Sequence, residues 1–337
     1  MPPFYVVTQN ARLRVANRRL QVEVELEGGG AQALDSVPLG QVSEVVLFGN
    51  VGLTTPAIDA LLAQECPVVF LTRRGEYRGR LSGPLTPHLP LRRAQYQRLD
   101  SQQFALEMAR GLVSAKLSHQ RALLLRHNRD LNDPIVAGAA DRLAAALREA
   151  PGKTRLSSLR GLEGAATAAY FSGYRRFFGP EWNFTDRNRR PPADPVNVLL
   201  SLGYTLLGQV AAAAVETVGL DPFGGFLHET VYNRPSLALD LLEEFRPVVD
   251  GLTLWCCRSG QLKVEDFSPG PPERPVALGE EGLRRFIQAF EQRMDMRFTH
   301  PIRGEKLNLR QCLIEQARQA AARILEDRPG WTGMGFR

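Results

Sequence analysis

Glu163, His228 and Glu243 are the residues of this 337-residue sequence whose chemistry points to a divalent-cation site. His228 lies in GGFLHETVYNRPSLALDLLEEFRPVVD (224–250), which also carries Asp240 and Glu243, and Glu163 lies in SLRGLEGAATAAYF (158–171). Two carboxylates and one imidazole suit Mg²⁺ or Mn²⁺ with waters completing the shell, whereas zinc would recruit further histidines or cysteines. Asp240, one helical turn before Glu243, is predicted to orient a ligand or to bind at the edge of the site.

The acidic residues of the second stretch lie on a predicted helix. Pro235 precedes the helix, Ser236 has the residue type of an N-cap, and Pro247 follows its end. Apolar residues recur at helical spacing at Leu237, Ala238, Leu241, Leu242 and Phe245. The opposite edge carries Asp240, Glu243 and Glu244. The alternative to a cation half-site is a capped amphipathic helix with a solvated acidic face.

Glu163 lies on another predicted helix, which runs from about 159 to 178. Gly161 and Gly164 flank it, and alanines follow at 165, 166, 168 and 169. A helix with so many small residues is predicted to pack closely against its neighbours, so that the carboxylate is at least partly buried. A buried carboxylate needs a cation, a metal or a proton. The alternative is that Glu163 pairs with Arg160 or faces solvent.

Basic residues form a third group of candidates. The segment GPEWNFTDRNRRPPADPVN (179–197) interleaves two aromatic residues with Arg187, Arg189 and Arg190. Aromatic side chains that stack bases and arginines that follow phosphates are typical of proteins that bind single-stranded or splayed nucleic acid. The alternative is a proline-rich surface loop in which Trp182 and Phe184 are buried. The candidate phosphate contacts are Arg187, Arg246, Arg303, Lys306 and Arg310.

The composition is that of a globular protein with a basic balance. Lysine and arginine total 42 against 36 acidic residues, for a net charge of +6 and a pI near 9.4. This balance favours a polyanionic partner. The four cysteines have neither zinc-site spacing nor the pattern of a disulfide framework, so a reducing cytoplasm is expected. We expect no signal peptide and no membrane span.

The sequence pattern predicts an α+β fold with two domains. Short strand-like runs and turn residues over 1–85 predict a small, mainly antiparallel β domain with one inserted helix and no phosphate-binding glycine loop. A proline-rich linker over 86–100 is predicted to follow. Helical periodicity then predicts a larger all-α domain over 101–326, with a flexible tail over 327–337.

Four motifs resemble those of the CRISPR-associated endonuclease/integrase family that inserts new spacers, the Cas-one family. They are VVLFGNVGLTTPAIDALLAQECPVVFLTRRGEYRGRL, LRGLEGAATAAYF, DRNRRPPADPVNVLLSLGYTLL and GGFLHETVYNRPSLALDLLEEFRPVVD, in the order found in the family. The resemblance places the family's metal ligands on Glu163, His228 and Glu243, and an acidic position on Asp240. Where many members read Met-Glu-Pro-Phe-Arg, this chain has LEEFR at 242–246, which retains the ligand.

The resemblance also implies an activity and partners. It implies a β domain that forms a homodimer, a helical catalytic domain, and assembly of two such dimers with a dimer of a small second Cas protein. The implied reaction is Mg²⁺- or Mn²⁺-dependent DNA cleavage and transesterification, in which a protospacer 3′-hydroxyl attacks the leader–repeat boundary of a CRISPR array. A catalytically inactive DNA-binding scaffold of the same complex is the alternative. A small-molecule phosphohydrolase is disfavoured by the arginine-rich segments and the lack of a nucleotide-binding loop.

Overall fold

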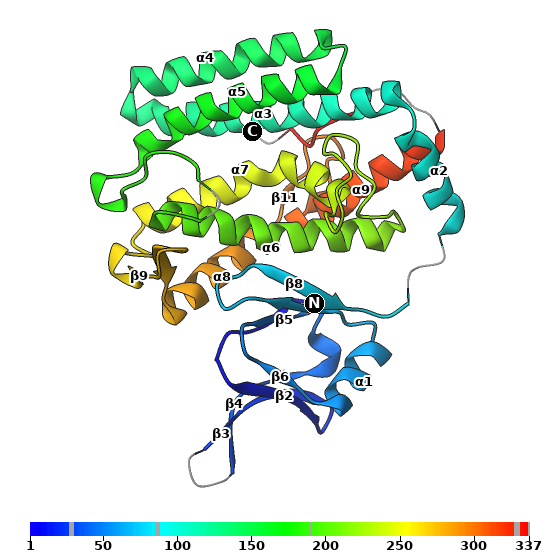
Figure 1. Cartoon of the computed structure of the whole chain (residues 1–337), viewed down its shortest axis with the longest axis vertical. Helices are drawn as coiled ribbons and strands as arrows, with labels where there is room; N and C mark the ends of the chain where they lie inside the picture. Colours follow the sequence, from blue (N-terminus) through cyan, green and yellow to red (C-terminus); the bar gives the residue numbers. More distant parts are fainter. Residues whose placement is uncertain (27–29, 85–87, 189–190, 327–330, 336–337) are drawn as a thin grey trace. The chain divides into compact units, whose positions relative to one another are not determined.

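A computed structural model describes residues 1–26, 30–84, 88–188, 191–326 and 331–335 of the chain. The chain divides into two compact units, which we call the β unit (Met1–Leu85 with Ala277–Arg284) and the helical unit (Thr86–Val276 with Arg285–Arg337). Figure 1 shows strands gathered in the first unit and long helices in the second. The predicted α+β class, with a small N-terminal β region before a larger helical region, is therefore confirmed.

The β unit contains two four-stranded sheets. The first has the strand order β1 (Phe4–Val6), β5 (Val45–Phe48), β7 (Val68–Leu71) and β8 (Tyr77–Leu81), with β1, β5 and β7 parallel and β8 antiparallel. The second has the order β4 (Ala31–Pro38), β3 (Arg19–Glu25), β2 (Ala11–Ala16) and β6 (Gly52–Leu53), antiparallel except for the β2–β6 pair. The parallel pairs were not part of the prediction. Helix α1 (Thr55–Ala63) lies between β5 and β7 in the chain and supplies the crossover that a parallel pair needs.

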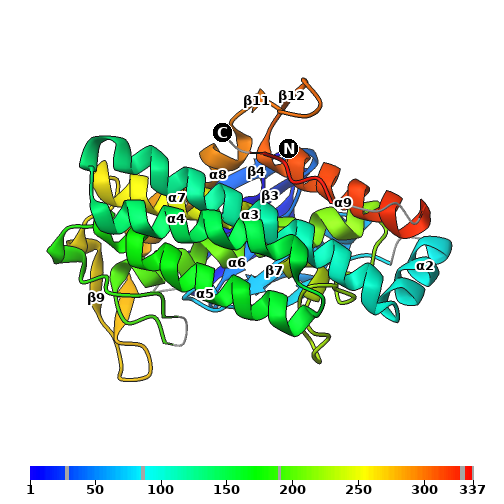
Figure 2. The ribbon, with the colours of Figure 1, turned by 90° about the horizontal axis from the view of Figure 1, so that it is seen from above.

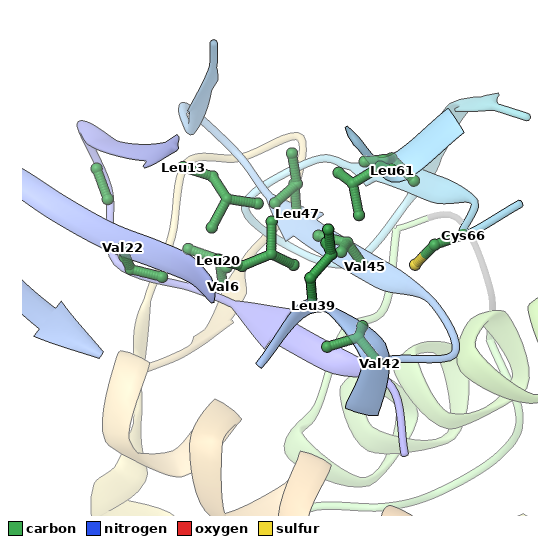
Figure 3. Close-up of a cluster of buried hydrophobic side chains, with 12 residues drawn as sticks. Val6, Leu13, Leu20, Val22, Leu39, Val42, Val45, Leu47, Leu61 and Cys66 are labelled. Carbon is green, nitrogen blue, oxygen red and sulfur yellow. The ribbon is translucent and has the colours of Figure 1, made fainter. Parts of the chain in front are cut away.

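The core of the β unit lies where apolar side chains from both sheets meet (Figure 3). Strand β5 reads VVLF and is buried throughout, as expected of a central strand covered on both faces. Leu13 and Leu20 from the second sheet pack into the same cluster as Val45 and Leu47. Asn17 and Arg18 both have positive φ (51° and 59°), the backbone of a tight two-residue hairpin between β2 and β3.

The helical unit is built mainly from long helices. They are α2 (Leu89–Leu99), α3 (Gln102–Leu131), α4 (Pro134–Glu149), α5 (Leu156–Tyr174), α6 (Pro195–Val218), α7 (Ser236–Arg258) and α9 (Leu309–Glu326). Helix α8 (Glu280–Asp295) spans the boundary of the two units. The short elements of this unit are η2 (Ala150–Gly152), η3 (Arg175–Phe177), η4 (Pro180–Trp182), η5 (Val264–Asp266), β9 (Phe267–Pro269), β11 (Phe298–Thr299) and β12 (Lys306–Leu307), while η1 (Leu39–Gln41) belongs to the β unit and β10 (Val276–Leu278) lies where the chain passes from one unit to the other. Figures 1 and 2 show α3, α4 and α5 side by side, with α7 packed on α3.

Helix α6 is the most apolar long helix of this unit. It packs against α7 and α9 through a face that includes Leu199, Leu206 and Ala211, all buried. By length and hydropathy alone, Pro195–Val218 would qualify as a membrane span, but 56% of its apolar window is buried inside the protein. A core helix of a folded helical unit meets the same criteria.

A buried polar cluster ties three of these helices together. The carboxylate of Asp250 on α7 accepts hydrogen bonds from the hydroxyls of Tyr170 (2.8 Å) on α5 and Tyr204 on α6. The hydroxyl of Tyr174 donates to the Asp250 carbonyl at 2.8 Å. Asp250 is fully buried, and burial raises its pKa to about 6 although the tyrosine hydrogen bonds act in the opposite direction.

Three segments differ from their predictions. Residues 86–100, predicted as a linker, include helix α2, which packs on α3 and α9. In the predicted tail, Met334 is buried and Trp331 lies against Gly111, while 327–330 and 336–337 lie outside the described residues. Pro247, predicted to follow the acidic helix, lies inside α7, which continues to Arg258 because its later residues are also buried among α3 and α6.

Replacing Asp250 by Asn should remove a pH-dependent part of the stability. Because the native state binds this proton more tightly than the unfolded chain, the contribution of Asp250 is complete below about pH 4 and is lost as the pH rises through 6. Between pH 4 and pH 7 the wild type should lose about 3 kcal/mol of unfolding free energy relative to Asp250→Asn. Denaturant titrations at several pH values measure this difference. If the unfolding free energies of the two proteins changed in parallel with pH, the prediction would be wrong. The control is Asp141→Asn, at an exposed position, whose pH profile should match that of the wild type.

Candidate metal centre

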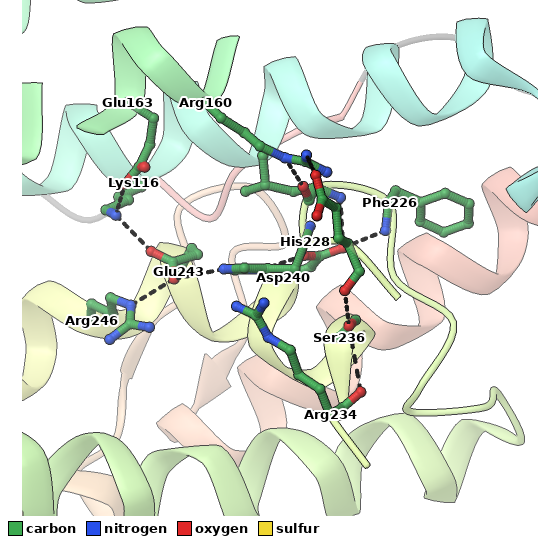
Figure 4. A network of polar contacts seen from close by, with 12 residues as sticks. Lys116, Arg160, Glu163, Phe226, His228, Arg234, Ser236, Asp240, Glu243 and Arg246 are labelled. Carbon is green, nitrogen blue, oxygen red and sulfur yellow. Dashed lines mark hydrogen bonds and ion pairs between the residues drawn. The ribbon is translucent and has the colours of Figure 1, made fainter. Parts of the chain in front are cut away.

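Glu163 and Glu243 meet around one positive charge in the helical unit (Figure 4). Lys116, on α3, forms an ion pair with Oε1 of Glu163 on α5, and its Nζ lies 2.7 Å from Oε2 of Glu243 on α7. The Lys116 and Glu243 side chains are only 4% and 5% exposed, and Glu163 is 24% exposed. Thr167 Oγ1 donates to Glu163 Oε1 at 2.9 Å. Two carboxylates from helices 80 residues apart in the chain therefore share a single cation.

His228 lies beside Glu243 and Asp240. Its Nε2 lies 3.7 Å from Oε1 of Glu243, and its Nδ1 lies 2.7 Å from Oδ1 of Asp240. A neutral imidazole in this position donates its Nδ1 proton to Asp240, so that the Nε2 lone pair is free on the side of Glu243. This is the tautomer that can bind a metal ion through Nε2.

Asp240 holds the loop that carries His228. Its fully buried carboxylate accepts the backbone N–H groups of Phe226 (2.6 Å), Leu227 (2.9 Å) and His228 (2.9 Å). Three backbone donors and the imidazole satisfy both oxygens, which fixes the loop against the first turn of α7. This geometry is what the orienting role predicted for Asp240 requires.

The backbone at Gly225 lies very close to the backbone of Ser236, the first residue of α7. A Cβ on Gly225 would lie 2.6 Å from the carbonyl carbon of Ser236, so only glycine fits there. Ser236 was predicted to cap the helix, but Pro235 occupies the N-cap position and no side chain caps it. The Ser236 hydroxyl instead donates to the Glu229 carbonyl at 2.9 Å and secures the other end of the His228 loop.

The environment of Glu243 is strongly positive. Arg246 Nε donates to its Oε1 at 2.8 Å, and Lys116 and His228 approach from the other sides. Burial raises the pKa of Glu243, but the charges of Arg246 and Lys116 hold it well below its usual value. Its Oε2 is buried and contacts the Lys116 ammonium without a well-aligned hydrogen bond. The Glu243 carboxylate is thus ionised, and its Oε2 can accept a closer contact from a cation than the one that Lys116 makes.

The donor set fits a hard divalent ion. Two carboxylates and one unprotonated imidazole nitrogen are ligands that Mg²⁺ and Mn²⁺ accept. The described ranges contain no cluster of three such ligands already at metal-binding spacing. The ammonium of Lys116 is in contact with the two carboxylates that would hold the ion, so a metal would have to replace it there.

The alternative of a solvated acidic face on α7 is wrong. The acidic edge of α7 is not solvated, because Asp240, Glu243 and Glu244 are all buried. Glu244 accepts hydrogen bonds from Gln316 Nε2 (2.8 and 3.0 Å) and the Met334 N–H, and burial raises its pKa to about 7. The prediction for α5 holds, because this helix packs on α3 and α4 and Glu163 is partly buried, although a Cβ at Gly161 or Gly164 would meet nothing within 4 Å.

The predicted phosphate contacts fall into two groups. Arg187 and Arg246 lie inside the unit, with guanidinium groups 5.5 and 4.6 Å from the centre of the Tyr204 ring. Arg303 and Arg310 form ion pairs with Glu315 and Glu291, and Lys306 is exposed on β12. Of these five residues, Arg246 contacts a candidate ligand, Glu243, whereas the ion pairs of Arg303 and Arg310 involve none of Glu163, His228 and Glu243.

The aromatic residues of the arginine-rich segment are buried rather than free to stack bases. Trp182 and Phe184 are 5% and 8% exposed, and the Phe184 ring packs against Tyr174 and Phe178. The alternative of a surface loop with two buried aromatics therefore describes this segment better. Arg189 and Arg190 lie outside the described residues.

Sequence reasoning missed Lys116 and the role of Arg160. Lys116 interrupts the apolar stripe of α3 formed by Ala109, Leu112 and Leu123, and a charged residue on such a stripe is the signal that could have revealed it. Arg160 was considered as a partner of Glu163. Its Nε instead donates to the Leu227 carbonyl at 2.7 Å, and its Nη1 pairs with Glu229, so it anchors the His228 loop.

Comparison with known proteins identifies the family. Residues 4–292 match the family described as CRISPR associated protein Cas1. The chain belongs to this family. It is 39% identical to the CRISPR-associated endonuclease Cas1 1 of Thermus thermophilus over 95% of each protein. It is 38% identical to a CRISPR-associated exonuclease Cas4/endonuclease Cas1 fusion of Rhodospirillum rubrum over 97% of this chain, and it spans 56% of that relative's length.

Solved structures share the fold of this Cas1 family member. A casposase bound to integration product superposes with a TM-score of 0.83 at 21% identity, covering 99% of this chain and 93% of the other. A chain of a Cas6-RT-Cas1–Cas2 complex gives a TM-score of 0.81 at 27% identity, covering 97% of this chain and 35% of the other. The family resemblance drawn from the motifs is confirmed.

Replacing Lys116 by Met should strongly destabilise the metal-free protein. Two carboxylates would then face each other across a largely buried space without their shared cation, at a cost of about 3–5 kcal/mol. Urea unfolding in EDTA measures the loss. Lys153→Met is the matched control, since Lys153 pairs with Glu149 on a more exposed surface and should cost less than about 1 kcal/mol. Equal losses for the two variants would contradict the account.

Proposed function

We propose that this protein is a divalent-metal-dependent DNA endonuclease and integrase that inserts spacers into a CRISPR array. The observation that carries the proposal is that Glu163 and Glu243 share the Lys116 ammonium, while His228 Nε2 lies 3.7 Å from the other carboxylate oxygen of Glu243. Membership of the Cas1 family supports the same reaction, since relatives are named as endonucleases. The proposed cofactor is Mg²⁺ or Mn²⁺, and the proposed location is the cytoplasm.

The structural neighbours support proposals about partners. One neighbour is a casposase bound to integration product, and another belongs to a complex that contains Cas2. By this likeness we assign DNA, from a protospacer and from a leader–repeat junction, as the substrate of this chain. We also assign a homodimer formed through the β unit and a small second Cas protein as its protein partners.

Each side chain of the site has a separate proposed role in phosphodiester chemistry. When bound, the divalent ion would supply charge stabilisation at the reacting phosphate. Glu163 and Glu243 would hold the ion, and His228 would add its Nε2 while Asp240 keeps the ring in the required tautomer. Arg246 keeps Glu243 ionised and oriented. Water would be the nucleophile in cleavage, and a DNA 3′-hydroxyl in strand transfer.

A bulky substrate can approach the Glu163 side of the site. Gly161, Gly164, Ala165 and Ala168 are exposed on α5 next to this partly exposed carboxylate. Arg234, just before α7, forms no ion pair with a described residue, and its side chain is drawn toward the His228 side of the network in Figure 4. Small exposed residues and a nearby arginine suit the backbone of a nucleic acid. Arg234 is thus an additional candidate phosphate contact.

Conservative substitutions of the ligands should abolish catalysis without abolishing DNA binding. Glu163→Gln, His228→Asn and Glu243→Gln each remove a ligand while keeping side-chain size, so Mn²⁺-dependent cleavage and strand transfer on branched DNA should fall by at least a hundredfold. Glu149→Gln, at an exposed pair, is the control. Circular dichroism checks the fold and a gel shift in EDTA checks binding.

The same assay separates the enzyme from the inactive scaffold. An enzyme gives product with the wild-type chain and Mn²⁺, and none with EDTA. A scaffold binds DNA equally with or without metal and gives no product in either case. Wild-type rates for His228→Asn would show that the assignment of the imidazole is wrong.

A further inference from the structure

Residues 331–335, which we call the C-terminal segment, pack into the helical unit. Met334 is fully buried in this segment. Trp331 lies against Gly111 of α3, where an added Cβ would come within 2.1 Å of the Trp331 Cβ. Gly111 therefore leaves the space that Trp331 occupies. The segment is thus seated against α3 and is not a solvated chain end.

Two glutamines of α9 hold the backbone of the segment. Gln319 Nε2 donates to the Thr332 carbonyl, and the Thr332 N–H donates to Gln319 Oε1, each at 3.0 Å. Gln316 Nε2 also donates to the Thr332 carbonyl, at 3.3 Å. A side-chain amide that pairs with both backbone groups of one residue acts as a neighbouring strand would. The place of Thr332 is therefore fixed through its backbone, while its side chain is exposed.

The third anchor of the segment is the buried carboxylate of Glu244 on α7. Its Oε1 accepts the Met334 N–H, and its Oε2 accepts the Trp331 indole N–H at 3.4 Å. A Cβ on Gly333 would lie 2.6 Å from the Cβ of Ala115 on α3 and 3.4 Å from Glu244 Oε1. Gly333 therefore lies between α3 and α7 at a point where only glycine fits.

The two helices that meet at Gly333 are those that carry Lys116 and Glu243. Ala115 directly precedes Lys116 on α3, and Glu244 directly follows Glu243 on α7. Successive side chains on a helix point about 100° apart. The segment and the Lys116–Glu243 ion pair therefore lie on neighbouring sides of the same contact between α3 and α7.

We propose that the C-terminal segment is a positioning element of the metal centre, with Gly333 setting the separation of α3 and α7 beside Glu243. A larger residue at 333 must either push Ala115 away or lift the segment off Glu244. In the second case the buried Glu244 carboxylate loses its Met334 N–H donor, and α7 must shift to satisfy it. Either movement displaces Glu243 from the position that a shared ion requires, because a metal site tolerates errors of only about 0.5 Å.

This inference rests on the proposed metal site and adds to it residues that bind neither the ion nor DNA. Calorimetric titration of the full-length, metal-free protein with Mn²⁺ tests it. Gly333→Ala should weaken Mn²⁺ binding about tenfold, the smaller effect expected for a residue that orients metal ligands. Gly152→Ala adds the same methyl group where it meets nothing within 4 Å, and should leave the affinity unchanged.

A compensating substitution distinguishes positioning from a general loss of stability. In Gly333→Ala/Ala115→Gly the clashing methyl of Ala115 is gone, and the remaining contacts of the new Cβ lie at 3.4 Å. The double variant should recover the affinity of the wild type for Mn²⁺, whereas two unrelated losses of stability would add. Hydrogen exchange should show faster exchange of the C-terminal peptide in Gly333→Ala and recovery in the double variant. Unchanged Mn²⁺ affinity of Gly333→Ala, or no recovery in the double variant, would overturn the proposal.

Glu243→Gln separates this inference from the proposed function. If the wild type binds Mn²⁺ and Glu243→Gln does not, the metal site stands, and the Gly333 variants alone decide the role of the segment. If Glu243→Gln binds Mn²⁺ as the wild type does, or if the wild type binds none, the proposed metal site is wrong and the positioning role is wrong with it.

Discussion

Helix α7 carries Asp240, Glu243 and Glu244 into the interior, and each carboxylate must find a partner there. Asp240 accepts hydrogen bonds from the backbone of the His228 loop. Glu244 accepts hydrogen bonds from Gln316 and from the Met334 N–H. Glu243 forms ion pairs with Arg246 and Lys116. These partners come from α3, α9, the loop before α7 and the chain after α9. The packing of the helical unit around α7 thus satisfies three buried carboxyl groups.

The same requirement prepares the site for a metal ion. Lys116 shows that the space between Glu163 and Glu243 accepts a positive charge, and the pKa of Glu243 stays low because several cations surround it. Arg246 is itself held over the Tyr204 ring, whose hydroxyl donates to Asp250. A continuous chain of contacts therefore runs from the buried tyrosine cluster to the carboxylate that is proposed to bind the ion.

The sequence predicted most of the helices from periodicity, and residue type singled out Glu163, His228 and Glu243 as candidate ligands. It did not reveal Lys116, since a lysine on a long helix is ordinarily solvated and its burial is decided by helices that meet it in space. The predicted end of the helix before Pro247 is wrong for a related reason. Proline usually ends a helix, but tertiary packing stabilises α7 beyond Pro247. The small residues of α5 predicted close packing, and Ala166, Ala169 and Gly173 are buried, but Gly161 and Gly164 face open space because composition alone does not tell a packed face from an open one.

The most direct test of the central claim is a crystal structure of the protein soaked in Mn²⁺, with the ion located by its anomalous scattering. The account predicts one strong peak bound by the carboxylates of Glu163 and Glu243 and by Nε2 of His228, with the Lys116 ammonium moved out from between the carboxylates. A structure at saturating Mn²⁺ in which Lys116 still bridges Glu163 and Glu243, and the metal lies elsewhere, would contradict it.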